Sequence, residues 1–244
     1  MRIIRSLWVL LNIIIGTVLM GVLAVVIGLL DRKKHAVGLV SKAWAKWILW
    51  STGLPITVTG LENLVPGQRY IHICNHSSAL DIPFALAYLP RPVVFMAKQE
   101  LFKIPLFGWA IWAAGCIPVN RSNRKAARKS VERAIAMLRE KPLSMVFFPE
   151  GTRTRSGELL PFKKGVFFLA LKSRLPLAPM AVSGAFEAVP PEKLYLTNTP
   201  IDITIGMPLD TGNLGDDERD SFIEHTREII AGLLAGQSPP PPTG

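Results

Sequence analysis

The chain has 244 residues, enough for one full-sized domain and an additional segment. Hydrophobic residues make up 49% of it and the mean hydropathy is +0.31, which is high for a soluble domain and low for a protein that crosses a membrane many times. The net charge of +10 favours anionic partners: nucleic acid, a membrane surface or a phosphorylated substrate. The histidines and cysteines show no zinc-ligand spacing, so we expect no metal site, and we expect Cys74 and Cys116 to be buried free thiols.

The first predicted element is an apolar stretch from Leu7 to Leu30, long enough to cross a hydrocarbon core of roughly 30 Å. It is longer than the apolar part of a secretory signal, and no Ala-x-Ala cleavage site precedes the basic cluster Arg32-Lys33-Lys34. We therefore predict an uncleaved membrane anchor, whose length leaves open whether it spans the bilayer or half-inserts. The basic cluster favours a cytoplasmic globular domain.

A second helix is predicted from Lys34 to Trp50. Three tryptophans recur near the helical period in it, with two lysines close by: Trp44, Trp47, Trp50, Lys42 and Lys46. Tryptophan on one face beside lysine is typical of a helix that lies in the membrane interface. The alternative is an amphipathic helix packed on a core. Residues 1–52 are thus predicted to form a membrane-associated helical pair.

From about Ile56, short apolar segments of strand type alternate with helical segments. The predicted strands are residues 69–75, 92–98, 117–120, 143–148, 177–182 and 201–205. The predicted helices are residues 82–89, 105–114, 124–140, 165–173 and 216–234. This alternation predicts an α/β fold over residues 53–236, with a central, mostly parallel sheet flanked by helices. The proline-rich end, residues 237–244, is predicted to be disordered.

A histidine and an aspartate follow the strand at 69–75, where the carboxyl end of a strand in an α/β sheet opens into a crevice. His76 and Asp81 are five residues apart, so a regular helix would not place them on one face, and the loop must fold back for them to meet. Asp81 is expected near a helix start, before Pro83. If they meet, the carboxylate fixes the imidazole tautomer and leaves the other nitrogen as a general base. Such a pair taken alone is more often structural.

Further polar residues follow the other predicted strands. Gly151 lets backbone amides approach a ligand, and the planar fork of Arg153 matches phosphate oxygens. Glu150 is a candidate to hold an arginine or a substrate hydroxyl, and the alternative for this segment is a solvated surface turn. The residues gathered at these strand ends are Lys98, Arg121, Glu150, Gly151, Thr152 and Arg153.

In their order along the chain, these segments resemble the motifs of the glycerolipid acyltransferase superfamily, and most closely its bacterial 1-acyl-sn-glycerol-3-phosphate (lysophosphatidic acid) acyltransferases. NHSSALD is similar to the family's His-x4-Asp motif and FPEGTRTRSG to its third motif. The segment from Lys98 to GCIPVNR resembles the second motif, and LPLAP the fourth. The resemblance covers roughly residues 60–181. The chain departs from many relatives at Ala79 and Asn120.

The resemblance implies transfer of a fatty acyl group from acyl-CoA or acyl carrier protein to the sn-2 hydroxyl of 1-acylglycerol 3-phosphate, giving phosphatidic acid. It implies that His76 is the general base and that Asp81 orients it. It also implies that Lys98, Arg121 and Arg153 hold the lipid phosphate, in a pocket completed by the 150–152 segment. No cofactor other than the donor substrate and no nucleic acid partner is expected. The expected location is the bacterial inner membrane, with the catalytic domain on the cytoplasmic side.

Two alternatives stay open. The same transfer to glycerol 3-phosphate, another lysophospholipid or a lyso-ornithine-type lipid would use the same residues. A non-enzymatic, membrane-tethered protein that binds anionic lipid would explain the charge and the anchor, but not the order of the motifs. A further group of apolar residues is interpreted as core, with an acyl-chain tunnel as the alternative: Phe102, Leu106, Phe107, Trp109 and Trp112.

Overall fold

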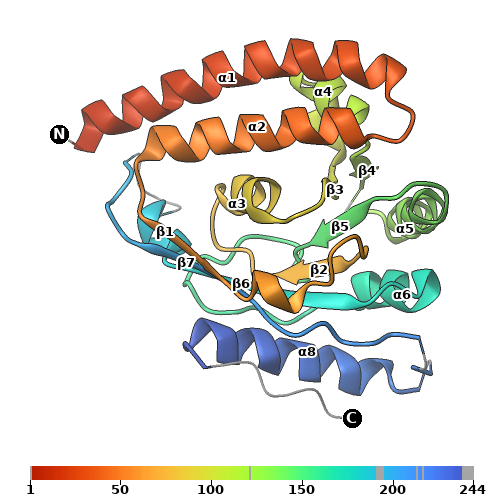
Figure 1. The fold of residues 1–244 in the computed structure, drawn as a ribbon. Helices are drawn as coiled ribbons and strands as arrows, with labels where there is room; N and C mark the ends of the chain where they lie inside the picture. The colour runs from red at the N-terminus through yellow and green to blue at the C-terminus, as the bar shows by residue number, and fades with distance from the viewer. Residues whose placement is uncertain (1, 121, 191–194, 213, 216, 238–244) are drawn as a thin grey trace.

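The computed structural model describes residues 2–120, 122–190, 195–212, 214–215 and 217–237. Within them a central sheet lies between two layers of helices (Figure 1). The strands are β1 (Ile56–Thr59), β2 (Ile71–Cys74), β3 (Val93–Lys98), β4 (Ile117–Val119), β5 (Ser144–Phe147), β6 (Leu177–Ser183) and β7 (Ile201–Ile205). Their order is β1-β7-β6-β2-β5-β3-β4, and among the strands of the described residues β6–β7 is the one antiparallel pair. The predicted α/β fold with a mostly parallel sheet is confirmed.

The sheet brings the carboxyl ends of β2, β3, β4, β5 and β6 to one edge, because these five strands run parallel. Edge strand β1 was not predicted. It has only four residues, and its burial alternates between half-buried and exposed. A strand this short carries too few apolar residues for a recognisable period.

Helices cover both faces of the sheet. They are α1 (Arg2–Leu30), α2 (His35–Thr52), α3 (Asp81–Tyr88), α4 (Phe107–Ala113), α5 (Arg124–Glu140), α6 (Lys164–Ser173), α7 (Ala185–Ala188) and α8 (Arg219–Leu234), with 3₁₀ turns η1 (Leu61–Asn63) and η2 (Gln99–Lys103). Helices α2 and α3 pack on one face around the fully buried Phe84. Helices α5, α6 and α8 pack on the other around Phe167. Helix α1 lies outside α2, so the first face carries an additional layer (Figure 1).

Helices α1 and α2 form a hairpin held by polar bonds between them. The ring N–H of Trp44 donates to Thr17 Oγ1 at 3.2 Å, and that of Trp47 donates to Asn12 Oδ1 at 3.0 Å. The predicted pair of helices is present, but the prediction that Trp44 and Trp47 face the membrane interface is wrong. A buried indole N–H needs an acceptor, and α1 supplies one for each ring. Trp50 is 70% exposed.

Helix α1 is, among the described residues, the one helix long and apolar enough to cross a membrane, by length and composition. It lies along the domain and does not project from it (Figure 1). Small residues on its inner side permit close packing: a Cβ added at Gly28 would lie 2.7 Å from the Cβ of Ala113 on α4. Its outer side chains, including Leu11, Leu19 and Val26, are exposed.

The apolar residues around α4 do not form core as predicted. Trp109 is 61% exposed and Trp112 is 65% exposed. Helix α4 packs chiefly against η2 and α1, and its outer face is exposed. Phe102, Leu106 and Phe107 are half-buried.

His72 is a buried histidine in the middle of the sheet, and burial lowers its pKa to about 3. Within the described residues its Nδ1 has no hydrogen-bond partner. An unfolded histidine binds a proton below about pH 6.5, whereas the folded one does not until about pH 3, so the free energy of unfolding falls as the pH is lowered across this window. We expect His72→Leu to reduce that slope by up to about 1.4 kcal/mol per pH unit. Urea unfolding at pH 7 and pH 5 checks this, and an unchanged slope would contradict it.

Candidate active site

His76 and Asp81 meet at the carboxyl end of β2, as predicted. His76 Nδ1 lies 2.8 Å from Asp81 Oδ2. Asp81 is the first residue of α3 and is fully buried, and the same oxygen accepts the backbone N–H groups of Ser77 and Ser78 at 2.8 Å each. These bonds fold the loop back on the helix start. Because Asp81 holds Nδ1, the tautomer with its proton there leaves Nε2 as the basic nitrogen.

The loop after β5 holds His76 from the other side. Glu150 is 3% exposed, and its Oε1 accepts the backbone N–H of His76 at 2.6 Å while its Oε2 accepts that of Leu160 at 3.0 Å. Thr154 N–H donates to the His76 carbonyl at 2.9 Å. The Phe148 ring stacks on the imidazole, with ring centroids 4.1 Å apart. The two motifs therefore form one structure around His76.

The contacts of Glu150 are not the ones predicted, which were to an arginine or a substrate hydroxyl. Both of its oxygens are bonded to backbone N–H groups. Burial raises the pKa of its carboxyl, while the His76 and Leu160 N–H bonds oppose that shift. The geometry gives Glu150 a positioning role toward His76, and substrate contact by Glu150 stays a prediction.

The structure describes two of the three predicted cations, Lys98 and Arg153. Lys98 ends β3, is 62% exposed at its side chain and lies 3.9 Å from Glu100. Thr152 and Arg153 are exposed on the loop after β5. Arg121 lies outside the described residues.

Sequence analysis missed Lys163, Phe148 and Thr154. Gly151 has a φ of +72°, and a Cβ there would clash with the Lys163 side chain, so glycine lets this lysine lie over the loop. The pair Lys163-Lys164, shortly after the FPEGTRTRSG motif, is the signal in the sequence that could have indicated this lysine. Phe148 and Thr154 flank Glu150 in the sequence, but their roles depend on where His76 lies.

An apolar cavity of about 130 Å³ lies close to this site. Its wall comes from α1, α2, α3, α4 and β3, and its lining includes Met20, Trp44, Ile82, Phe95 and Cys116. Phe95 stacks on Phe148, with centroids 6.2 Å apart, and Phe148 stacks on His76. Burial raises the pKa of the Cys116 thiol to about 11, so it stays protonated at neutral pH.

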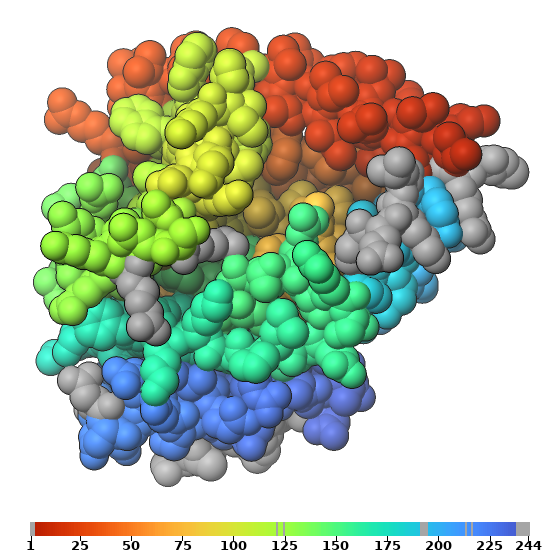
Figure 2. Space-filling view, turned by 180° about the vertical axis from the view of Figure 1, so that it is seen from behind, coloured from red at the N-terminus to blue at the C-terminus, as the bar shows by residue number. Residues whose placement is uncertain are grey.

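Figure 2 shows the site as a hollow on the face seen from behind. Gold atoms of the segment that carries the His–Asp loop lie in it, between α1 in red, the yellow segment of η2 and α4, and the green loop after β5. In the part of the chain that the structure describes, no group of three His, Cys, Asp or Glu side chains is arranged to hold a metal ion.

An α/β fold with a buried carboxylate behind a histidine, beside an apolar cavity, is typical of an enzyme site for an apolar substrate. Comparison with known proteins shows to which enzyme family the chain belongs. The sequence pattern of the family described as Acyltransferase matches residues 55–183. The chain belongs to this acyltransferase family.

Several relatives carry the name 1-acyl-sn-glycerol-3-phosphate acyltransferase. The one from Cocos nucifera is 37% identical over 80% of this chain and 61% of its own length. The one from Saccharomyces cerevisiae is 32% identical over 90% of this chain and 74% of its own length. The one from Escherichia coli is 30% identical over 68% of this chain and 66% of its own length. The chain thus spans about three fifths to three quarters of these relatives.

The crystal structure of the 1-acyl-sn-glycerophosphate (LPA) acyltransferase PlsC from Thermotoga maritima has the same fold. Its TM-score to this chain is 0.82, over 96% of this chain and 95% of that one, at 23% sequence identity. The similarity includes the helices before the sheet, since nearly the whole of both chains is covered.

Proposed function

We propose that the protein transfers a fatty acyl group from a thioester donor to the sn-2 hydroxyl of 1-acyl-sn-glycerol 3-phosphate, giving phosphatidic acid. The observation that carries this is the His76–Asp81 pair at 2.8 Å, fixed on both sides by backbone hydrogen bonds. The printed names of the relatives support the choice of acceptor.

The chemistry needs one base and no covalent enzyme intermediate. His76 Nε2 takes the proton of the acceptor hydroxyl as its oxygen bonds to the thioester carbonyl carbon. The buried Asp81 carboxylate stabilises the imidazolium that forms. When the tetrahedral intermediate collapses, the C–S bond breaks and the imidazolium proton goes to the departing thiolate. The apolar cavity beside Phe95 suits a fatty acyl chain, because its lining offers almost entirely apolar side chains.

Arg153, Lys98 and Arg121 are proposed to bind the acceptor phosphate. We expect Arg153→Ala to raise the acceptor KM by about 10-fold, because the substitution removes one charge-assisted hydrogen bond to the phosphate. The effect on kcat should be smaller. Initial rates against lysophosphatidate concentration measure this. Arg128→Ala, an exposed arginine on the outer side of α5, serves as the matched control. An unchanged acceptor KM in Arg153→Ala would remove it from the phosphate site.

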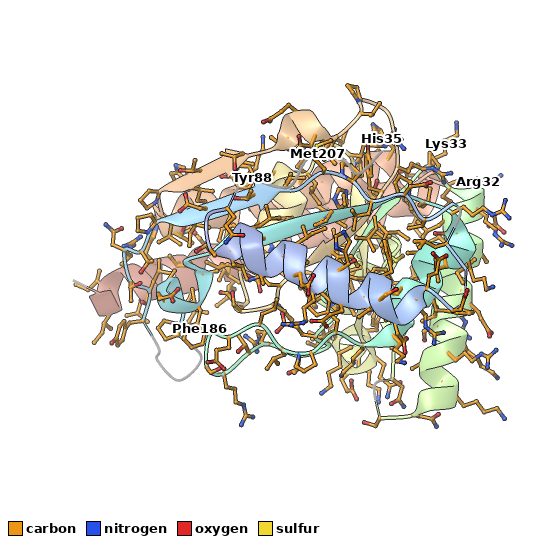
Figure 3. The ribbon with its side chains drawn as sticks, turned by 90° about the horizontal axis from the view of Figure 1, so that it is seen from below. Arg32, Lys33, His35, Tyr88, Phe186 and Met207 are labelled. Atoms are coloured by element: carbon orange, nitrogen blue, oxygen red, sulfur yellow. The ribbon has the colours of Figure 1, made fainter. Side chains whose placement is uncertain are left out.

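The enzyme is proposed to lie on a membrane through the outer side of α1 and the exposed Trp109 and Trp112 of α4. Lateral contact fits better than spanning, because α1 packs against α2, is hydrogen-bonded to it at Asn12 and Thr17, and α2 packs on α3. Arg32 and Lys33 project outward at the α1–α2 turn (Figure 3), where they can meet anionic headgroups. The cytoplasmic face of a bacterial inner membrane is the proposed location. Protease accessibility of tags at both ends of α1 in sealed vesicles tests this, since a spanning helix would place them on opposite sides.

The reaction is tested by thiol release from acyl-CoA and acyl carrier protein with detergent-solubilised protein. Lysophosphatidate, glycerol 3-phosphate, lysophosphatidylcholine and a lyso-ornithine lipid are offered in parallel. We expect release with lysophosphatidate. Release with another acceptor alone would replace the substrate and keep the mechanism, and no release from folded protein would favour a lipid-binding role.

A further inference from the structure

Lys163 is a cation beside the active site that the proposed reaction has not used. Its backbone N–H donates to the Pro149 carbonyl at 2.9 Å, which fixes it against the start of the loop after β5. It lies directly before α6, and that loop borders the hollow seen in Figure 2. Lys163 is therefore held at the same edge of the sheet as the His–Asp pair.

The side chain of Lys163 runs over Gly151 in this loop. A Cβ added to Gly151 would lie 2.5 Å from Lys163 Nζ and 3.0 Å from its Cε and Cδ. The ammonium group thus lies against the residue that follows Glu150, whose carboxylate holds the His76 backbone. Arg153 is two residues further on, so its Cα is at most about 8 Å from that of Gly151. One short stretch of the site therefore brings together two positively charged residues.

The ammonium group of Lys163 is available to a ligand. It is exposed, and within the described residues no hydrogen bond or ion pair engages it. The neighbouring Lys164 differs, because its Nζ lies 2.5 Å from Asp220 Oδ2 beside α8. Like charges placed close together repel each other, and an anion bound between them removes that repulsion. Of the two adjacent lysines, Lys163 is thus the one placed to bind an anion at the site.

The charge of the acceptor headgroup depends on its ester type. A phosphate monoester carries about −1.5 to −2 at pH 7, because its second pKa is about 6. A phosphodiester keeps a single negative charge at the same pH. Coulomb energy is proportional to the product of the charges, so an added cation stabilises a bound monoester more than a bound diester. A second cation on the loop is therefore a means of selecting acceptors by charge.

We propose that Lys163 binds the acceptor phosphate together with Arg153 and makes the site selective for phosphate monoesters over phosphodiesters. The inference rests on the proposed transfer to 1-acyl-sn-glycerol 3-phosphate and assigns a specificity-determining residue to the acceptor side of that site. Lysophospholipids whose phosphate carries a second substituent are disfavoured by their lower charge as well as by their size.

The test compares lysophosphatidate with its phosphate methyl ester, which has nearly the same shape and a lower charge. Both are offered with one acyl donor to detergent-solubilised wild type, Lys163→Met, Lys163→Arg and Lys164→Met. We expect Lys163→Met, which keeps the length of the side chain, to raise the KM by about 10-fold for lysophosphatidate and by about 3-fold for the methyl ester. The KM for the donor should stay within about 2-fold.

The other two variants are the controls. Lys163→Arg keeps the charge and should retain most of the selectivity between the two lipids. Lys164→Met should match wild type, because its ion pair with Asp220 is exposed and contributes little to stability. Thermal melts of each variant show that it is folded.

Calorimetric binding of the two lipids gives a readout without turnover. Between about pH 5 and pH 7.5 the phosphate of lysophosphatidate loses its second proton, whereas the methyl ester has none to lose. In wild type, the affinity for lysophosphatidate relative to the methyl ester should therefore rise with pH. Lys163→Met should reduce this rise, which a residue that only shapes the loop would leave unchanged.

Equal losses for the two lipids in Lys163→Met would overturn the proposal, because Lys163 would then act without sensing the headgroup charge. Unchanged KM values and affinities in that variant would overturn it as well. If wild type acylates neither lipid, the proposed reaction fails by itself, and the ratio of the two affinities still decides the role of Lys163. Absence of binding of either lipid to wild type would overturn both.

Discussion

We expect His76→Ala to lower kcat by about 10²- to 10⁴-fold while leaving the fold intact, because a positioned general base contributes an effect of this size. His76 is held through its backbone by Glu150 and Thr154, and those bonds do not need the imidazole. The side chain can therefore be removed without opening the loop. Thiol release with lysophosphatidate at saturating substrate measures the loss.

The matched control is His225→Ala, which removes an exposed histidine on α8 far along the chain from the His–Asp loop. It should retain full activity. Asp81→Asn refines the result, since the amide oxygen can still accept from Ser77 and Ser78 but the charge that stabilises an imidazolium is gone. A large fall in Asp81→Asn with an unchanged melting temperature supports the electrostatic role. Activity of His76→Ala within about 10-fold of wild type would rule out His76 as the base.

The second large effect is expected for Glu150→Ala, through His76 and not through the substrate. The substitution leaves the N–H groups of His76 and Leu160 without their acceptor, each at a cost of about 1–3 kcal/mol if it stays buried. We expect kcat to fall at least about 10-fold, because small displacements of a catalytic group cost that much or more. The KM values for donor and acceptor should change little, and the melting temperature should fall.

Glu150→Gln separates the two roles, because it keeps one oxygen acceptor and the shape of the side chain. We expect its kcat and melting temperature to lie between those of wild type and Glu150→Ala. Glu140→Ala, at an exposed glutamate ending α5, controls for loss of a surface carboxylate. A raised acceptor KM with normal kcat and stability in Glu150→Ala would show instead that Glu150 contacts the substrate.

Local patterns in the sequence predicted most of the elements. The amphipathic period predicted a helix over residues 124–140, and α5 has these bounds, Arg124–Glu140. The strands predicted from apolar runs lie within a few residues of the observed β2, β5 and β6. Asp81 begins α3 as the nearby Pro83 suggested. These features depend on residues within one or two turns of each other, which is why a single sequence contains them. The domain boundaries at 52–53 and 236–237 stay predictions, and residues 238–244 of the tail lie outside the described residues.

By itself, the sequence determined the α/β class, the apolar first helix and the chemical identity of the His–Asp pair. Tertiary structure decided what each side chain faces. Trp44 and Trp47 face α1 because Thr17 and Asn12 lie across from them, and Trp109 and Trp112 are exposed because they lie on the side of α4 away from α1 and η2. Glu150 lies 74 residues after His76 in the chain, yet it bonds the His76 backbone because β2 and β5 are neighbours in the sheet. Strand order joins distant segments, and no local periodicity encodes which segments will meet.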